Sequence, residues 1–194
     1  MFGVQQYEIE QFAEQHDVDL IVMGTKGENA KRSIFMGSIT KGLIQNASCP
    51  VLAIPGDCEF GEILRIVYAT DLRFDETNAV KYFIKIAELY NASLIILYLD
   101  VNRDKELQHV KKLQRIVDKA NYPRISYQEI LVDNVSARIE KFVQDNQIDM
   151  LAMMTTTTSI FDKILHRSLT KQMLFHTHIP LFTIRRTKKS IVFL

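Results

Sequence analysis

Glycine and hydroxyl residues are spaced in one stretch of the chain as a phosphate-binding loop would need them. Gly24 and Gly27 stand three apart, nine residues follow, and Gly37, Ser38 and Thr40 end the stretch. Glycine lets the backbone approach a ligand closely, and the first N–H groups of a helix attract negative charge. The spacing therefore favours phosphate binding, although the same residues also serve as ordinary turns and helix caps. It matches neither the Gly-Lys-Ser/Thr phosphate loop nor G-x-G-x-x-G.

The elements that must position these residues are a strand, a loop and a helix. Residues 18–23 (VDLIVM) form a short apolar run typical of a buried strand, so Gly24 follows a strand end. Residues 38–45 place apolar side chains on one helix face, with Ser38 where a capping residue stands. Inside the loop, Lys26 is suited to neutralise phosphate charge or to lie solvated.

The chain contains an internal repeat. A shift of 130 residues aligns residues 9–54 with residues 139–184 without a gap and gives 12 identities in 46 positions. Ordinary residue frequencies give about three by chance. We call residues 1–56 the first copy, residues 57–62 the linker and residues 63–194 the second copy. The first copy begins at the helix before its fourth strand, so it is the C-terminal half of a domain.

The second copy alternates strands and helices. We expect strands at residues 64–70, 93–99, 125–131, 148–154 and 181–186, and helices at residues 75–91, 103–120, 134–145 and 167–176. This alternation predicts the α/β class with a doubly wound parallel sheet. Ligands of such sheets bind at the carboxyl ends of the strands.

The stretch DLIVMGTKG, nine residues and then GSITKGLIQNASCPVLAIP resembles the end of a universal stress protein domain. The resemblance covers nearly the whole chain and implies a five-stranded parallel sheet in the order 3-2-1-4-5. It also implies ATP as the ligand, with Asp71 of YATDL as the nucleoside contact. The triphosphate contacts that it implies come from Gly24, Thr25, Lys26, Gly27, Gly37, Ser38, Ile39 and Thr40. Members of this family pair through their last strands, so we expect residues 51–54 to lie antiparallel to residues 181–184.

The two parts of this implied ATP site stand in different copies. The first copy has the glycine loop but lacks the strand that would carry its aspartate. The second copy has Asp71, but Met154, Thr157 and Arg167 replace the loop glycines, and side chains there obstruct backbone contact with phosphate. We therefore expect this chain to bind ATP weakly or not at all. Asp71 is alternatively a cap for the next helix.

Composition narrows the function classes. A net charge of +1 gives no electrostatic footprint for nucleic acid or an anionic membrane. Cys49 and Cys58 lack the spacing of a zinc site or a disulfide framework, so we expect no metal. No apolar run reaches 18 residues and the N-terminal sequence does not resemble a signal peptide, so we expect a cytoplasmic protein.

Three functions remain open. The first is an ATP-binding protein of the universal stress type, and the second is an interaction or scaffold module of the same fold. A weak ATP hydrolase ranks last, because no nucleophile with an adjacent base and no paired catalytic carboxylates can be identified. The last strands and the uncovered half domain predict a homo-oligomer, because an unpaired edge at residues 19–23 invites a second chain.

Overall fold

A computed structural model describes residues 2–25, 36–59, 61–72, 74–100, 107–156 and 178–186. The described residues form five helices and seven strands. The helices are α1 (Phe2–Gln15), α2 (Ser38–Asn46), α3 (Thr77–Tyr90), α4 (Leu107–Lys119) and α5 (Val135–Asp145). The strands are β1 (Ile21–Gly24), β2 (Val51–Ile54), β3 (Arg65–Thr70), β4 (Ser93–Asp100), β5 (Ile125–Leu131), β6 (Met150–Thr155) and β7 (Leu181–Arg185). The helix expected at residues 167–176 lies outside the described residues.

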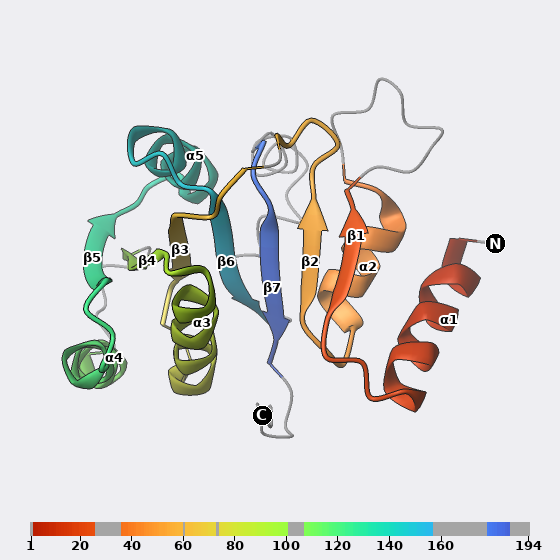
Figure 1. Cartoon of the computed structure of the whole chain (residues 1–194), viewed down its shortest axis with the longest axis horizontal. Coiled ribbons are helices and arrows are strands. Elements are labelled where there is room, and N and C mark those ends of the chain that lie inside the picture. The colour runs from red at the N-terminus through yellow and green to blue at the C-terminus, as the bar shows by residue number, and fades with distance from the viewer. Residues whose placement is uncertain are drawn as a thin grey trace.

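These strands form one sheet in the order β1-β2-β7-β6-β3-β4-β5 (Figure 1). Within the second copy every neighbouring pair is parallel. The order of that part, β5-β4-β3-β6-β7, reads 3-2-1-4-5 in chain order. The central strand β3 is buried from Ile66 to Thr70, as its near-continuous apolar sequence predicts. The expected α/β class with its parallel sheet is confirmed.

The two copies meet where β2 pairs antiparallel with β7. The partners are Val51 with Thr183, Leu52 with Phe182 and Ala53 with Leu181, as expected from the sequence. In Figure 1 the arrows of β2 and β7 point in opposite directions. The carboxyl ends of β1 and β2 therefore lie at the opposite edge of the sheet from those of β3 to β7. Both edges of β2 and of β7 are paired within the chain.

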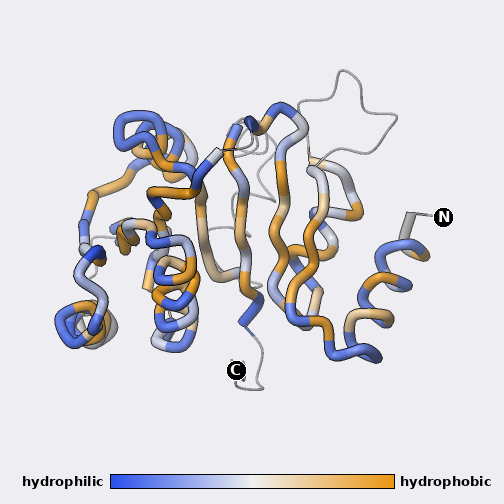
Figure 2. The backbone as a smooth tube through the Cα atoms, viewed as in Figure 1, coloured by the Kyte–Doolittle hydropathy of each residue, from blue (hydrophilic) through white to orange (hydrophobic). Residues whose placement is uncertain are grey.

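Helices cover both faces of the sheet. Buried apolar residues of α2 and α5 pack on one face, including Leu43 and Ile139. Buried residues of α3 and α4 pack on the other, including Phe83 and Leu113. Figure 2 shows the apolar strands between these helices. None of the described helices has the length and apolar character of a membrane span.

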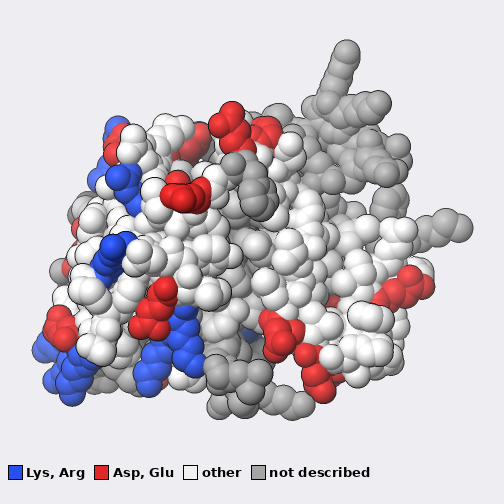
Figure 3. All heavy atoms as spheres, in the orientation of Figure 1, with Lys and Arg blue, Asp and Glu red and all other residues white. Residues whose placement is uncertain are grey.

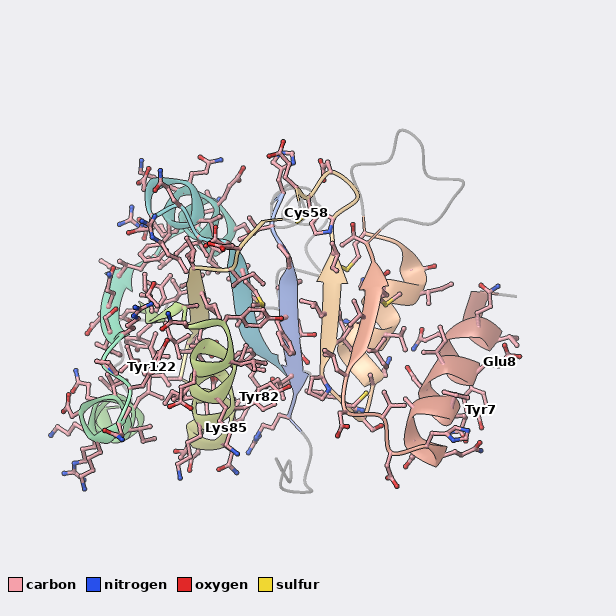
Figure 4. All side chains as sticks on the ribbon, in the orientation of Figure 1. Tyr7, Glu8, Cys58, Tyr82, Lys85 and Tyr122 are labelled. Carbon is pink, nitrogen blue, oxygen red and sulfur yellow. The ribbon has the colours of Figure 1, made fainter. Side chains whose placement is uncertain are left out.

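One side of the molecule leaves apolar residues uncovered. Val22 of β1 is 56% exposed, although Ala152 at the equivalent repeat position is fully buried. Phe12 of α1 is 60% exposed, whereas its equivalent Phe142 is 9% exposed. In Figure 3 the near face over β1 and β2 is largely uncharged, and Figure 4 shows Tyr7 of α1 pointing away from the sheet. We call this region, formed by exposed residues of α1 and β1, the β1 surface; its large apolar members are Val4, Tyr7, Ile9, Phe12 and Val22.

Candidate functional site

The predicted site of the first copy lies where β1 ends and α2 begins. The N–H of Thr25 donates to the carbonyl of Ile54 at 2.9 Å, and the N–H of Gly37 donates to the carbonyl of Thr25 at 2.7 Å. The buried hydroxyl of Thr40 donates to the carbonyl of Gly24 at 3.0 Å. These bonds tie the first turn of α2 to the strand end. The structure thus brings Gly24, Thr25, Gly37 and Thr40 together.

The start of α2 differs in one respect from the prediction. Gly37 is the residue before the helix, with φ −60° and ψ 151°, and no side chain caps the helix. Ser38 is the first helical residue, so the expectation that it caps α2 is wrong: a cap needs the extended backbone that Gly37 has taken. The first helical bond runs from the N–H of Lys41 to the carbonyl of Gly37 at 3.0 Å. The N–H groups of Ser38, Ile39 and Thr40 precede it, and such groups are suited to bind an anion.

Backbone conformation does not explain why Gly37 is glycine. None of the described glycines, Gly24 included, has a positive φ. A β-carbon added to Gly37 would lie 3.5 Å from the Thr25 carbonyl oxygen and 3.9 Å from the Thr40 hydroxyl, which are ordinary contacts. What glycine supplies here is open backbone beside the helix start. Two further predicted contacts, Lys26 and Gly27, lie outside the described residues.

Asp71 lies at the opposite edge of the sheet from Gly24. It follows β3, which runs antiparallel to β1 and β2 across the β2–β7 junction. The structure therefore does not bring Asp71 to the loop of the first copy. The cap position of α3 is Glu76 and not Asp71, and the side chain of Glu76 makes no capping hydrogen bond. Asp75 accepts from the N–H of Thr77 at 3.1 Å and from its hydroxyl at 2.6 Å.

The turn after β3 holds a residue in a strained conformation. Leu72 is buried and has φ 51°, in the left-handed region that favours glycine. Its N–H donates to the hydroxyl of Thr70 at 2.9 Å. Backbone strain of this kind concentrates at ligand sites. It makes the carboxyl end of β3 a second candidate region, separate from the loop of the first copy.

A buried carboxyl group beside this turn was missed by sequence reasoning. The hydroxyl of Tyr68, itself fully buried, donates to Glu76 at 2.5 Å. Burial raises the pKa of Glu76 to about 7, against the opposing effect of the hydrogen bonds from Tyr68 and Thr70. Asp71 adds to this rise. In the sequence Glu76 reads as an ordinary residue near a helix start, since only the tertiary fold places it against Tyr68.

Several acidic groups lie at this edge of the sheet. Asp71 lies close enough to Glu76 for its negative charge to raise the pKa of the Glu76 carboxyl group. Asp100 is buried at the end of the neighbouring strand β4. Among the described residues, Arg186 is a basic group near Glu76, and its guanidinium carbon lies 4.1 Å from the ring centroid of Phe74. Two of the replacements for the loop glycines, Thr157 and Arg167, lie outside the described residues.

Side chains of the last residues of β6 and β7 join the copies. The hydroxyl of Thr155 donates to the carbonyl of Ile44 at 3.1 Å. The guanidinium of Arg185 donates to the carbonyl of Asn46 at 2.6 Å. Both contacts satisfy carbonyl groups at the C-terminal end of α2, where a cation also suits the helix dipole. Thr155, the first residue of a threonine run, thus has a structural partner.

No group of three or more His, Cys, Asp or Glu residues suited to a metal occurs within the described ranges. Cys49 and Cys58 are free thiols, and burial is the largest cause that raises the pKa of each. His178 Nδ1 lies 2.8 Å from a carboxylate oxygen of Asp57.

Known proteins resemble this chain over most of its length. The model of the universal stress protein family matches residues 2–55 and 62–185. Universal stress protein Slr1230 of Synechocystis sp. is 26% identical over 172 residues, which cover 87% of this chain and 58% of that protein. Universal stress protein MJ0531 of Methanocaldococcus jannaschii is 48% identical over 52 residues, or 27% of this chain and 31% of that protein. The chain thus spans less than two thirds of the length of these relatives.

Solved structures share the fold at low identity. A universal stress protein of Archaeoglobus fulgidus superposes with a TM-score of 0.69 at 14% identity, covering 94% of this chain and 66% of that chain. A universal stress protein in complex with cAMP superposes with a TM-score of 0.51 at 15% identity, covering 66% of this chain and 100% of that chain. These likenesses establish the fold.

Proposed function

Since this chain belongs to the universal stress protein family, we propose that it is a nucleotide-responsive stress protein whose phosphate site lies in the first copy. The observation that carries the proposal is the β1–α2 junction. There the N–H groups of Ser38, Ile39 and Thr40 begin a helix that the Thr40 hydroxyl fixes to Gly24. Fixed N–H groups at the positive end of a helix bind phosphate oxygens without reorganisation. The binding of cAMP by a protein of similar fold supports a nucleotide as the ligand class.

The proposed site would contact the phosphates of ATP, but it does not include the residue that the family resemblance assigns to the nucleoside. Asp71, the residue that the family resemblance assigns to the nucleoside, lies at the other edge of the sheet. Phosphate contacts alone must offset the entropy lost when a flexible ligand is fixed. We therefore propose that ATP binds this chain weakly, through Gly24, Thr25, Lys26, Gly27, Gly37, Ser38, Ile39 and Thr40.

A charge-reversal experiment tests this site. Gly37→Asp places a carboxylate at the helix start, and its β-carbon has ordinary contacts, so the fold should persist. Gly61→Asp is the matched control, because a β-carbon there meets nothing within 4 Å. Binding of tripolyphosphate, measured by isothermal titration, should be lost in Gly37→Asp and kept in Gly61→Asp. Equal binding by both variants would contradict the proposal.

The second candidate function is an interaction module, and the β1 surface favours it. Exposed apolar side chains beside a sheet edge commonly mark a contact with another chain. We propose a second copy of this chain as the partner, since β1 is an edge strand. A cytoplasmic location belongs to the proposal as well, because free thiols such as Cys49 and Cys58 suit a reducing compartment.

A further inference from the structure

A groove of about 890 Å³ lies between the linker, the end of α3 and the starts of β3, β6 and β7. One side of it is apolar, formed by Leu52, Ile54, Tyr90, Ile63, Ile179 and Pro180. Cys58, labelled at the top of Figure 4, also lines it. Among the described residues of the proposed nucleotide site, none of Gly24, Thr25, Gly37, Ser38, Ile39 and Thr40 lines the groove. Ile54 lies between the two regions, because it lines the groove and its carbonyl accepts from the N–H of Thr25.

The charged residues of the groove are predominantly acidic. Among the described residues that line it, Asp57, Glu59, Glu62 and Asp149 carry four negative charges and Arg124 carries one positive charge, a net of −3 when His178 is neutral. Figure 3 shows acidic side chains gathered at the top of the view, above β2 and β7. Such a rim repels phosphate and attracts cations.

Several of these charges already have partners within the protein. Asp149 accepts from the N–H groups of Leu64 and Arg65, at 2.9 and 2.8 Å. Arg124 donates to the carbonyl of Asn91 at 2.5 Å, and Asp57 pairs with His178.

Glu59 and Glu62 differ from these charged residues of the groove in their lack of partners among the described residues. Both are exposed, and among the described residues their carboxylates have no hydrogen bond or ion pair. Within the part of the chain that the structure describes, they therefore supply the charge of the rim that no basic group offsets.

We propose that this groove is a docking site for a peptide segment that carries basic residues beside apolar ones. Its apolar side chains would lie against Ile54 and Ile63, where they remove apolar surface from water. Its basic side chains would pair with Glu59 and Glu62. The C-terminal end of α3, at Tyr90 and Asn91, adds the negative end of a helix dipole to the same groove. Charge complementarity of this kind selects the partner and its orientation.

A fluorescently labelled peptide tests the proposal. The probe is acetyl-KKSIVFL-amide, a sequence that this chain itself contains at residues 188–194 and that joins two lysines to an apolar run. The control is acetyl-EESIVFL-amide, which keeps the apolar part and reverses the charge. Fluorescence anisotropy at low salt should give binding of the first peptide at least tenfold tighter than of the second. Binding of neither peptide, or equal binding of both, overturns the proposal.

Substitutions then locate the bound peptide. The double variant Glu59→Gln/Glu62→Gln should weaken binding at least threefold, because it removes the uncompensated rim charge. Asp118→Asn/Asp133→Asn removes the same charge from exposed positions outside the groove and should leave binding unchanged. Ile63→Ser should weaken binding while the far-ultraviolet circular dichroism stays the same. An unchanged affinity in Glu59→Gln/Glu62→Gln overturns the proposal.

Discussion

Glu76 lies buried at the start of α3, where its environment raises the pKa of its carboxyl group from 4.5 to about 7. The folded state therefore binds this proton more tightly than the unfolded state. Stability from this group is fully present below pH 4.5 and is lost as the pH rises through 7. A shift of this size corresponds to roughly 3 kcal/mol in the free energy of unfolding.

Replacing this carboxyl group with a neutral amide should remove the contribution of Glu76 to the pH dependence of the free energy of unfolding. Glu76→Gln can still accept the Tyr68 hydrogen bond, so we expect it to be more stable than the original chain at pH 8, by about 1–3 kcal/mol. Near pH 4.5 the two proteins should be similar. Urea unfolding at both pH values measures the difference, and Glu140→Gln on α5 is the control. Parallel pH profiles for the original chain and Glu76→Gln would refute this assignment.

The hydroxyl of Thr40 should stabilise the proposed site by a measurable amount. Thr40→Val keeps the shape of the buried side chain but removes the hydrogen bond to the Gly24 carbonyl. We expect the free energy of unfolding to fall by about 1–2 kcal/mol. Thr40→Ser retains the hydroxyl and should lose less. Urea denaturation compares the three proteins, and equal losses in the two variants would argue against a role for the bond.

At the residue scale, the sequence predicted which residues lie at the β1–α2 junction, but it did not predict what each of them does there. Gly24, Thr25, Gly37 and Thr40 come together because β1 and α2 are consecutive elements and hydrogen bonds join the helix start to the strand end. The capping role assigned to Ser38 was wrong, since a one-residue shift of the helix start decides which residue caps. Glu76 could not be found, because its burial depends on contacts that only the folded sheet and α3 create.

At the scale of elements, periodicity predicted strand and helix types well and some ends poorly. The strand expected at residues 125–131 is observed as β5 with the same bounds. The strand expected at residues 18–23 is observed as β1, Ile21–Gly24. The N–H of Val18 donates to the carbonyl of Ala13 in the last turn of α1, so Val18 does not pair with a strand. Pairing with the β2 segment begins where the N–H of Ile21 donates to the carbonyl of Pro50. Apolar character alone does not reveal where pairing begins.

The C-terminal end of α3 gives a prediction at this scale. Asn91 ends the helix with φ 52°, and its carbonyl accepts from Arg124. Asn91→Gly should keep or slightly raise stability, because glycine adopts this conformation without strain. Asn91→Val should lower the free energy of unfolding by about 1–2 kcal/mol, since a β-branched side chain disfavours positive φ. Thermal unfolding of the two variants measures this, and a Val variant as stable as the Gly variant would contradict it.

At the scale of the whole molecule, the β1 surface should cause self-association. The last strands pair within one chain, so that contact is already used, while β1 keeps an open edge. We expect the mass measured by sedimentation to rise with concentration. Val22→Glu should shift the distribution towards the monomer, because it places charge on this surface.

A matched variant tests whether the position matters. Leu89 of α3 is 77% exposed and lies away from β1, so Leu89→Glu adds the same charge elsewhere. It should leave the self-association unchanged. A chain that is monomeric at all concentrations, or that responds equally to both substitutions, would exclude the β1 surface as the contact.

The antiparallel β2–β7 junction places the glycine loop and Asp71 at opposite edges of the sheet, and this separation is the central claim about function. Isothermal titration of the unaltered chain with ATP and with tripolyphosphate tests it most directly. If only the phosphates are held, the two ligands should bind with affinities within about threefold of each other and weaker than micromolar. ATP binding at micromolar affinity or tighter, with tripolyphosphate far weaker, would mean that a nucleoside pocket exists and would contradict the account.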